Sequence, residues 1–251
     1  FYHWQIGQLR KSGVDIRLGN EATPDLLKSL APDAIVVATG ARVETPDIPG
    51  ADSRHVFSGA QLRRFAEGTA TVSDLRMLPG PLRPVAAWVL KAASSRLTPA
   101  LIRNVTRRYL PLGKGIVIVG ADLAAIEVAE FLVRRGRKVH VLEEGNRVAP
   151  EIGPKRLTEH MDRLDKLGIT VNTEVTVHSI TKGQVRYLTV SGVERALPAD
   201  SVILAGEPVA ATEFYEQVKD LAAEVHAVGD CTGLGLIRKA TKEGMAIACQ
   251  L

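Results

Sequence analysis

The sequence GIVIVGADLAAIEVAEFLVRRGRKVHVLE, residues 115–143, decides the fold. It begins with the apolar run Gly115–Val119, which has the length of a strand and suits one buried on both faces of a sheet. An amphipathic helix follows over residues 122–135 and stops at Gly136. A second apolar strand, Lys138–Leu142, completes the unit. This strand–helix–strand order predicts parallel strands in a doubly wound α/β sheet.

The turn between the first strand and the helix is typical of a dinucleotide site. Such a site needs a tight turn, backbone amides at a helix N-terminus facing the pyrophosphate, and an acid that binds the ribose 2′-hydroxyl. Gly120 supplies the first glycine, and Glu143 supplies the acid 23 residues later. The other two glycine positions carry Asp122 and Ala125. Ala125 is tolerated, because that position requires only close approach of helix and strand.

Asp122 departs from the pattern and leaves two interpretations open. Its carboxylate would repel the pyrophosphate by on the order of 4 kcal/mol at about 4 Å, before screening, at a dielectric of about 20. As the N-cap of the helix, the same side chain would have a structural role. This half of the chain is therefore either a nucleotide site or a degenerate scaffold. If it binds nucleotide, Glu143 favours NADH over NADPH, because a 2′-phosphate would meet a carboxylate.

Similar strands and helices flank this unit on both sides. Apolar strands are predicted at Ala34–Ala38, which suits burial on both faces, at Ser201–Leu204 and at Glu224–Val228, and a short strand at Val14–Leu18. Helices are predicted at 1–12, 24–30 (capped by Thr23, with Pro24 in the first turn), 59–67, 155–167 and 236–251. Shorter runs at 174–181, 184–190 and 193–197 favour an antiparallel meander. The pattern predicts an α/β fold of two doubly wound dinucleotide-binding folds, one inserted in the other, with a meander and a helical insertion.

We expect three parts: residues 1–60 with 206–251 as one domain, 61–112 as a basic helical insertion, and 113–205 as the second domain. From Leu75 to Ala121 there is no acidic residue and there are eight basic ones. The insertion is either a helical cap or a docking surface for an acidic partner, an anionic membrane or an acyl-CoA. The cap would pack through Val85, Trp88, Val89, Leu101 and Val105.

Composition excludes several classes of protein. The net charge of +4 is too mild to argue for nucleic acid, and no nucleic-acid partner is expected. Apolar runs end well before the roughly 18 residues that a membrane span needs. Cys231 and Cys249 are the two cysteines, and we expect no disulfide between them. A cytoplasmic location follows as the default. The histidines have no metal-binding spacing, so no metal site is predicted.

Two motifs near the ends of the chain carry a family resemblance. The run PDAIVVATG at 32–40, followed by Ile48-Pro-Gly50, resembles the Ala-Thr-Gly segment of two-dinucleotide-fold flavoproteins. Ala227-Val-Gly-Asp-Cys231, followed by Ala240 and Glu243-Gly244, resembles their C-terminal FAD motif. With Pro111–Lys114 and residues 129–143, the chain resembles the C-terminal FAD/NAD(P)-binding half of old yellow enzyme-like NADH:flavin oxidoreductases. That group includes 2,4-dienoyl-CoA reductase, enoate reductases and trimethylamine dehydrogenase.

The resemblance implies roles for residues at the motifs. Gly229 and Asp230 would lie near FAD, with Asp230 at the ribityl chain or the pyrophosphate, and Ala38, Thr39 and Gly40 would form a crossover close to the cofactor. Ala22 would offer backbone to the adenine, or is a plain loop residue. The implied cofactors are FAD and NADH, and no side chain is assigned a catalytic role. A redox pair of cysteines, as in disulfide reductases, is missing, and Cys231 is expected to be a small buried residue.

Two functions from different classes follow. The first is an enzyme module that passes electrons from NAD(P)H through FAD toward a second flavin, which reduces an unsaturated substrate. The resemblance also implies a first FAD-binding βαβ unit and an N-terminal barrel with FMN and an iron–sulfur cluster. We therefore expect a fragment, or one piece of an assembly, whose partner is that barrel domain or a partner subunit, in a homo-oligomer. The alternative is a non-catalytic, degenerate assembly module that holds ADP or no nucleotide.

Overall fold

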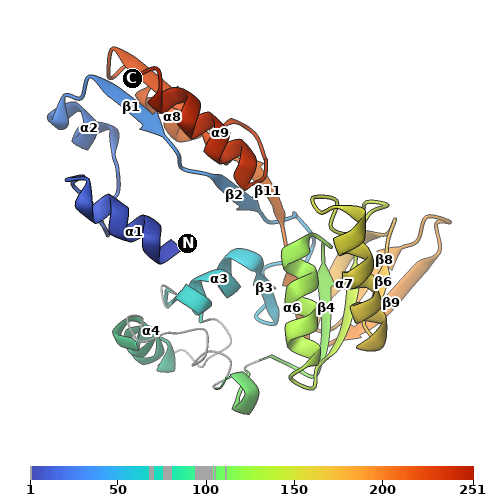
Figure 1. Ribbon diagram of the computed structural model, residues 1–251. Helices are drawn as coiled ribbons and strands as arrows, with labels where there is room; N and C mark the ends of the chain where they lie inside the picture. Colours follow the sequence, from blue (N-terminus) through green and yellow to red (C-terminus); the bar gives the residue numbers. More distant parts are fainter. Residues whose placement is uncertain (1, 68–70, 76–80, 94–103, 105, 111) are drawn as a thin grey trace. The chain divides into compact units, whose positions relative to one another are not determined.

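The computed structural model describes residues 2–67, 71–75, 81–93, 104, 106–110 and 112–251. The chain divides into two compact units, residues 1–42 with 209–251 and residues 43–208. The second unit is therefore inserted in the first, and both combine helices with parallel strands (Figure 1). The predicted fold class is confirmed.

The larger unit is built on a parallel sheet. Among the described residues this sheet has five strands, in the order β3 (Val56–Ser58), β10 (Ser201–Leu204), β4 (Gly115–Val119), β5 (Lys138–Leu142) and β6 (Thr170–Asn172). Ile116, Val117 and Ile118 of the central strand β4 are fully buried. A strand covered on both faces needs such a continuous apolar run, which is why the sequence predicted it.

Different elements cover the two faces of this sheet. Helices α6 (Leu123–Val133) and α7 (Pro154–Lys166) contribute Ile126, Ala129, Leu132 and Leu164 to one hydrophobic cluster. The antiparallel meander of β7 (Thr176–Thr181), β8 (Gly183–Leu188) and β9 (Glu194–Ala199) contributes Val185 and Tyr187 to the other. The predicted meander is confirmed, and it completes the burial of the sheet.

The basic insertion is described only in part. Helices α3 (Gly59–Glu67) and α4 (Leu82–Ala93) precede the β4 strand. Asp74 is buried and is held by two bonds from the Arg64 guanidinium and by the Thr71 amide. Val85 and Trp88 are 59% and 71% exposed, so the predicted packing of a cap through these two side chains is wrong. Leu101, Val105 and the side chain of Val89 lie outside what the structure describes.

The smaller unit has a parallel strand pair at its centre. In the part of the chain that the structure describes, β1 (Ala34–Val37) and β12 (Glu224–Ala227) pair with each other alone. The unit also contains α1 (Tyr2–Lys11), α2 (Pro24–Leu30), α8 (Glu213–Val218), the 3-10 turn η2 (Gly229–Thr232) and α9 (Ile237–Ala248). The Thr23 hydroxyl accepts from the Leu26 amide, and Pro24 occupies the first turn of α2, as predicted. Two short strands that the sequence did not predict, β2 (Ala41–Glu44) and β11 (Glu207–Ala210), pair where the chain passes between units.

Three predictions in this region are wrong. Residues 14–18, all described, form loop and turn rather than a strand, and Leu18 is 86% exposed. The run at 34–38 is not buried on both faces, because its sheet has two strands among the residues that the structure describes and leaves Val36 44% exposed. The boundary also lies earlier than residue 60. Residues 43–60 belong to the larger unit, since Val56–Ser58 pairs in parallel with Val202–Leu204.

No helix in the described ranges is long and apolar enough to cross a membrane.

Candidate nucleotide-binding sites

The turn from β4 into α6 has the backbone geometry expected of a dinucleotide site. Gly120 has φ +101°, a conformation that disfavours residues with a side chain. A Cβ at this position would lie 3.0 Å from the Cβ of Ala205, at the end of the neighbouring strand. The glycine therefore allows the turn and the close approach together. Ala125, at the third position of the motif, is buried against the sheet as predicted.

Asp122 is the N-cap of α6. Its Oδ1 accepts a 2.7 Å hydrogen bond from the Ala125 amide, which confirms the capping interpretation. Burial raises the pKa of the Asp122 carboxyl, the bond from Ala125 opposes that rise, and the nearby carboxylates of Glu151 and Glu143 add to it. The carboxylate therefore lies in a site that already disfavours negative charge.

Glu143 lies at the end of β5, where the sequence predicted a ribose-binding acid. Its Oε2 accepts a 2.6 Å bond from the Ala121 amide, and its Oε1 accepts a 2.7 Å bond from the Gly145 amide. The structure thus brings Gly120, Asp122, Ala125 and Glu143 together at one end of α6. In this arrangement the Glu143 carboxylate is hydrogen-bonded to the backbone of the turn that would receive the pyrophosphate.

Sequence reasoning missed one member of this site, Glu151. Its Oε1 accepts a 2.5 Å bond from the amide of Leu123, the first residue of α6. Glu151 lies in the loop between β5 and α7, and the sole hint in the sequence is the run of acids after the second strand. Three carboxylates, on Glu143, Glu151 and Asp122, therefore accept from the amides of Ala121, Leu123 and Ala125. The amides of Leu123 and Ala125 belong to the first turn of α6, the positive end of the helix dipole, which would otherwise attract phosphate.

The two end motifs meet at the carboxyl edge of the β1–β12 pair. The strands are parallel, Val37 is in register with Ala227, and the Val228 amide donates to the Val37 carbonyl at 2.9 Å. This register brings Ala38-Thr39-Gly40 beside Gly229-Asp230, although about 190 residues separate them along the chain. Ala38 and Thr39 are exposed, and a Cβ on Gly40 (φ +76°) would meet open space.

Two side chains of α9 order the turn after β12. Gly229 has φ +78°, and its amide donates to Oε2 of Glu243 at 2.7 Å, a bond that lowers the pKa of this carboxyl. The Lys239 ammonium donates to the carbonyls of Gly229 and Gly233 and to the Thr232 hydroxyl. Asp230 Oδ1 accepts from the amide of Gly235 at 3.0 Å. The sequence motif included Glu243 without a role, and Lys239 was not predicted.

The two cysteines and Ala22, the remaining predicted residues, differ in their burial. Cys231 is buried, with Sγ 3.1 Å and 3.4 Å from the carbonyl oxygens of Val228 and Val37, so it is a small core residue as expected. Both cysteines are free thiols. Ala22 lies in an exposed loop before α2. In the described ranges, no three His, Cys, Asp or Glu side chains form a group that could hold a metal.

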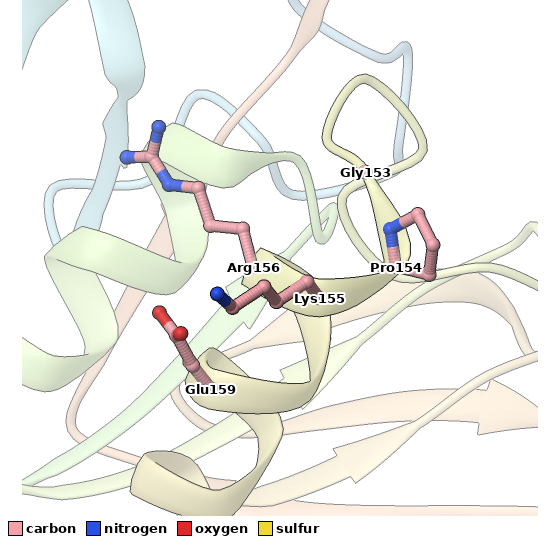
Figure 2. Close-up of a pocket in the computed structure, with 5 residues that line it drawn as sticks. All are labelled: Gly153, Pro154, Lys155, Arg156 and Glu159. Carbon is pink, nitrogen blue, oxygen red and sulfur yellow. The ribbon is translucent and has the colours of Figure 1, made fainter.

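A surface pocket of about 380 Å³ lies at the first turn of α7 and contains none of the predicted residues. Figure 2 shows its lining: Gly153, Pro154, Lys155, Arg156 and Glu159. Arg156 also pairs with Glu127 of α6 at 3.6 Å. The pocket thus opens at the first turn of α7, beside an ion pair that joins α7 to α6.

The interleaved α/β folds, each with a candidate nucleotide site at the carboxyl edge of its parallel strands, are the architecture of a protein with two dinucleotide-binding folds. In agreement with this class, the model of the pyridine nucleotide-disulphide oxidoreductase family matches residues 6–244, and the chain belongs to this family. The resemblance to the nucleotide-binding half of the old yellow enzyme-like reductases is confirmed.

Relatives match all or nearly all of this chain at low identity. It is 24% identical to the NADH oxidase of Thermoanaerobacter brockii over 100% of the chain and 33% of the relative. It is 25% identical to the bilirubin reductase of Mediterraneibacter gnavus over 96% of the chain and 31% of the relative. The chain therefore spans about a third of the length of these relatives.

Solved structures show the same fold. A 2-naphthoyl-CoA reductase superposes with a TM-score of 0.71 at 24% identity, over 100% of this chain and 32% of that one. Histamine dehydrogenase from Rhizobium sp. 4-9 superposes with a TM-score of 0.66 at 17% identity, over 99% and 35%.

Proposed function

We propose that this chain is the electron-transfer module of a larger flavin-dependent reductase. NADH, in preference to NADPH, would deliver electrons to FAD, and these would pass to a second flavin that reduces an unsaturated substrate. The observation that carries the proposal is the meeting of Ala38-Thr39-Gly40 with Gly229-Asp230 at one edge of a parallel strand pair. Ligands of open α/β sheets bind outside the carboxyl ends of such strands. The names of relatives, NADH oxidase and the cinnamate reductase of Clostridium sporogenes, agree with this chemistry.

The residues at the β1–β12 edge fit FAD. On one side Thr39 is exposed and a Cβ on Gly40 would meet open space, and on the other Asp230 presents a carboxylate that can accept from a ribityl hydroxyl. Lys239 and Glu243 would hold the Gly229 turn in place. Ala22 would lie near the adenine. FAD, when bound, would supply the redox chemistry, while the protein binds and orients it.

The β4–α6 edge fits a nicotinamide dinucleotide less well. Glu143 retains acceptor capacity for ribose hydroxyls and would repel a 2′-phosphate, which supports the preference for NADH. The amides that a pyrophosphate would use are engaged by carboxylates in this conformation. This observation favours the alternative function, a non-catalytic module that holds ADP or no nucleotide.

Anaerobic titration of the full-length protein with NADH, followed by the flavin absorbance, tests the two functions. We expect bleaching with NADH, and slower bleaching with NADPH. If neither coenzyme bleaches the flavin at millimolar concentration, the electron-transfer function is rejected. Calorimetric titration with ADP then tests the alternative.

The proposal extends to the remainder of the protein. We propose a cytoplasmic homo-oligomer in which this module works with a barrel domain or partner subunit that holds FMN and an iron–sulfur cluster. Flavin extraction, iron and sulfide analysis, and sedimentation of the full-length protein test these parts separately. If FAD is the one cofactor found, FMN and the iron–sulfur cluster are rejected. The role of the module in electron transfer is then decided by the NADH titration alone.

A further inference from the structure

The three carboxylates at the start of α6 differ in how firmly they are held. Asp122 is half-buried and caps α6 through its bond from the Ala125 amide. Glu143 ends a buried strand and accepts from two amides. Glu151 is exposed, and the Leu123 amide is the partner that the structure gives its carboxylate. Of the three, Glu151 is the one that can leave without breaking a strand end or a helix cap.

The loop that carries Glu151 is anchored on both sides of this residue. The buried residue Ala149 donates its amide to the Ala121 carbonyl at 2.7 Å, which attaches the loop to the β4–α6 turn. After Glu151 the chain reaches Gly153 and Pro154, which begin α7 (Figure 2). The anchor holds the Glu151 carboxylate near the Leu123 amide. On the other side of Glu151, Ile152 packs against the hydrophobic cluster of the larger unit and donates its amide to the Ala149 carbonyl at 3.1 Å. The Glu151 side chain itself is exposed, so it can turn away from the Leu123 amide by rotation about its own bonds while the backbone stays in place.

Electrostatics make the contact of Glu151 favourable and easily reversed. Its carboxylate gains from the helix dipole, as any anion at this amide would. It also lies near Asp122, and its charge contributes to raising the pKa of that half-buried carboxyl. A phosphate group that approached the turn would compete for the same amide and would be repelled by the same charge.

From these contacts we propose that Glu151 is a built-in competitor for the phosphates of the nucleotide. It occupies the first amide of α6 when the site is empty, and nucleotide binding displaces it. The competition lowers affinity for ligands that carry a pyrophosphate and leaves affinity for the nucleoside part unchanged. This inference rests on the proposed function in that the natural ligand would be the nicotinamide dinucleotide.

Calorimetry with the full-length protein tests the competition, with ADP-ribose and adenosine as probes. Glu151→Ala should tighten the Kd of ADP-ribose by about tenfold, because an amide and its dipole become available to phosphate. Glu151→Gln, which loses the charge and keeps an acceptor, should give a smaller gain. The matched control is Glu159→Ala, which removes an exposed carboxylate of α7 and should stay within about twofold of wild type. Adenosine affinity should be the same in all four proteins.

Hydrogen–deuterium exchange gives a readout that needs no ligand. The peptide containing Leu123 should exchange faster in Glu151→Ala than in wild type or in Glu159→Ala, since its amide loses its acceptor. Equal exchange would show that Glu151 does not hold this amide.

The outcomes separate this inference from the proposed function. Tighter ADP-ribose binding in Glu151→Ala without flavin bleaching by NADH would support the competitor and reject electron transfer. If NADH bleaches the flavin while wild type and Glu151→Ala bind ADP-ribose with the same Kd, the competitor is rejected and electron transfer is kept. No detectable ADP-ribose binding in any variant would also reject the competitor.

Discussion

The Glu143 carboxylate accepts a 2.6 Å hydrogen bond from the Ala121 amide, across the turn where the pyrophosphate of a dinucleotide would lie. A carboxylate has about four acceptor positions, so this bond leaves capacity for ribose hydroxyls. Glu143→Gln should therefore weaken NADH binding and lessen the discrimination against NADPH by about tenfold, since the repulsion of a 2′-phosphate is removed. The ratio of the Kd values for NADPH and NADH, measured for each variant, gives this discrimination. Glu144→Gln, next to it on the loop, is the control, and an equal change in both variants would contradict the assignment.

Asp122 combines a cap and a repulsive charge, and two substitutions separate these effects. Asp122→Asn keeps a good N-cap, so stability should change by less than about 0.5 kcal/mol, while Asp122→Ala should cost about 1 kcal/mol. Both should tighten ADP-ribose binding, because both remove the negative charge. Chemical denaturation measures the change in stability, and calorimetry measures the Kd of ADP-ribose. Unchanged affinity in both variants would mean that the charge of Asp122 does not reach the phosphates.

The same residue predicts a pH dependence of binding. The pKa of Asp122 is raised in the folded protein, chiefly by burial, so the group takes up its proton at a higher pH than an ordinary aspartate. As pH falls toward this raised pKa, the repulsion should decrease and ADP-ribose should bind more tightly. In Asp122→Asn that gain should be absent. A wild-type gain that persists in Asp122→Asn would assign it to another group.

The contact of Arg64 with Asp74 should stabilise the region after α3 in a pH-dependent way. Hydrogen bonds from the Arg64 guanidinium, and then from Thr71, hold the pKa of Asp74 well below its usual range. A depressed carboxyl pKa contributes stability above its unfolded value of about 3.9 and loses it as pH falls below that value. Asp74→Asn should therefore cost about 1.5 to 3 kcal/mol near neutral pH, and the difference from wild type should shrink below about pH 4. Denaturant melts at both pH values check this, and a difference independent of pH would contradict it.

Cys231 lies beside the flavin motif and is predicted to have no redox role. Its thiol is buried against backbone carbonyls, and Cys249 is a free, exposed thiol. Cys231→Ala should leave the rate of flavin reduction by NADH within about twofold and cost on the order of 1 kcal/mol of stability, because it removes one buried atom. Stopped-flow reduction tests the rate. A loss of reduction with intact flavin binding would give the thiol a chemical role.

How far the sequence predicted each site depends on the range of the interactions. The N-cap at Asp122, the turn at Gly120 and the start of α2 at Thr23 were predicted, because capping and turn chemistry act over three or four residues. The acid at Glu143 was predicted in position but not in its bonds to Ala121 and Gly145. Those bonds depend on how the loop after β5 closes over the turn.

By itself, the sequence determined most of the strands and helices of the inserted α/β fold and the positions of the two end motifs. Apolar periodicity and short motifs carry this information locally. Only the tertiary structure decided that Val56–Ser58 joins the larger sheet, that residues 14–18 form no strand, and that Val36 stays exposed. It also decided that Glu151 meets Leu123, 28 residues apart, and that Glu243 meets Gly229. Strand pairing and loop closure select these partners from many residues of the same type, and no local pattern identifies which of them will come into contact.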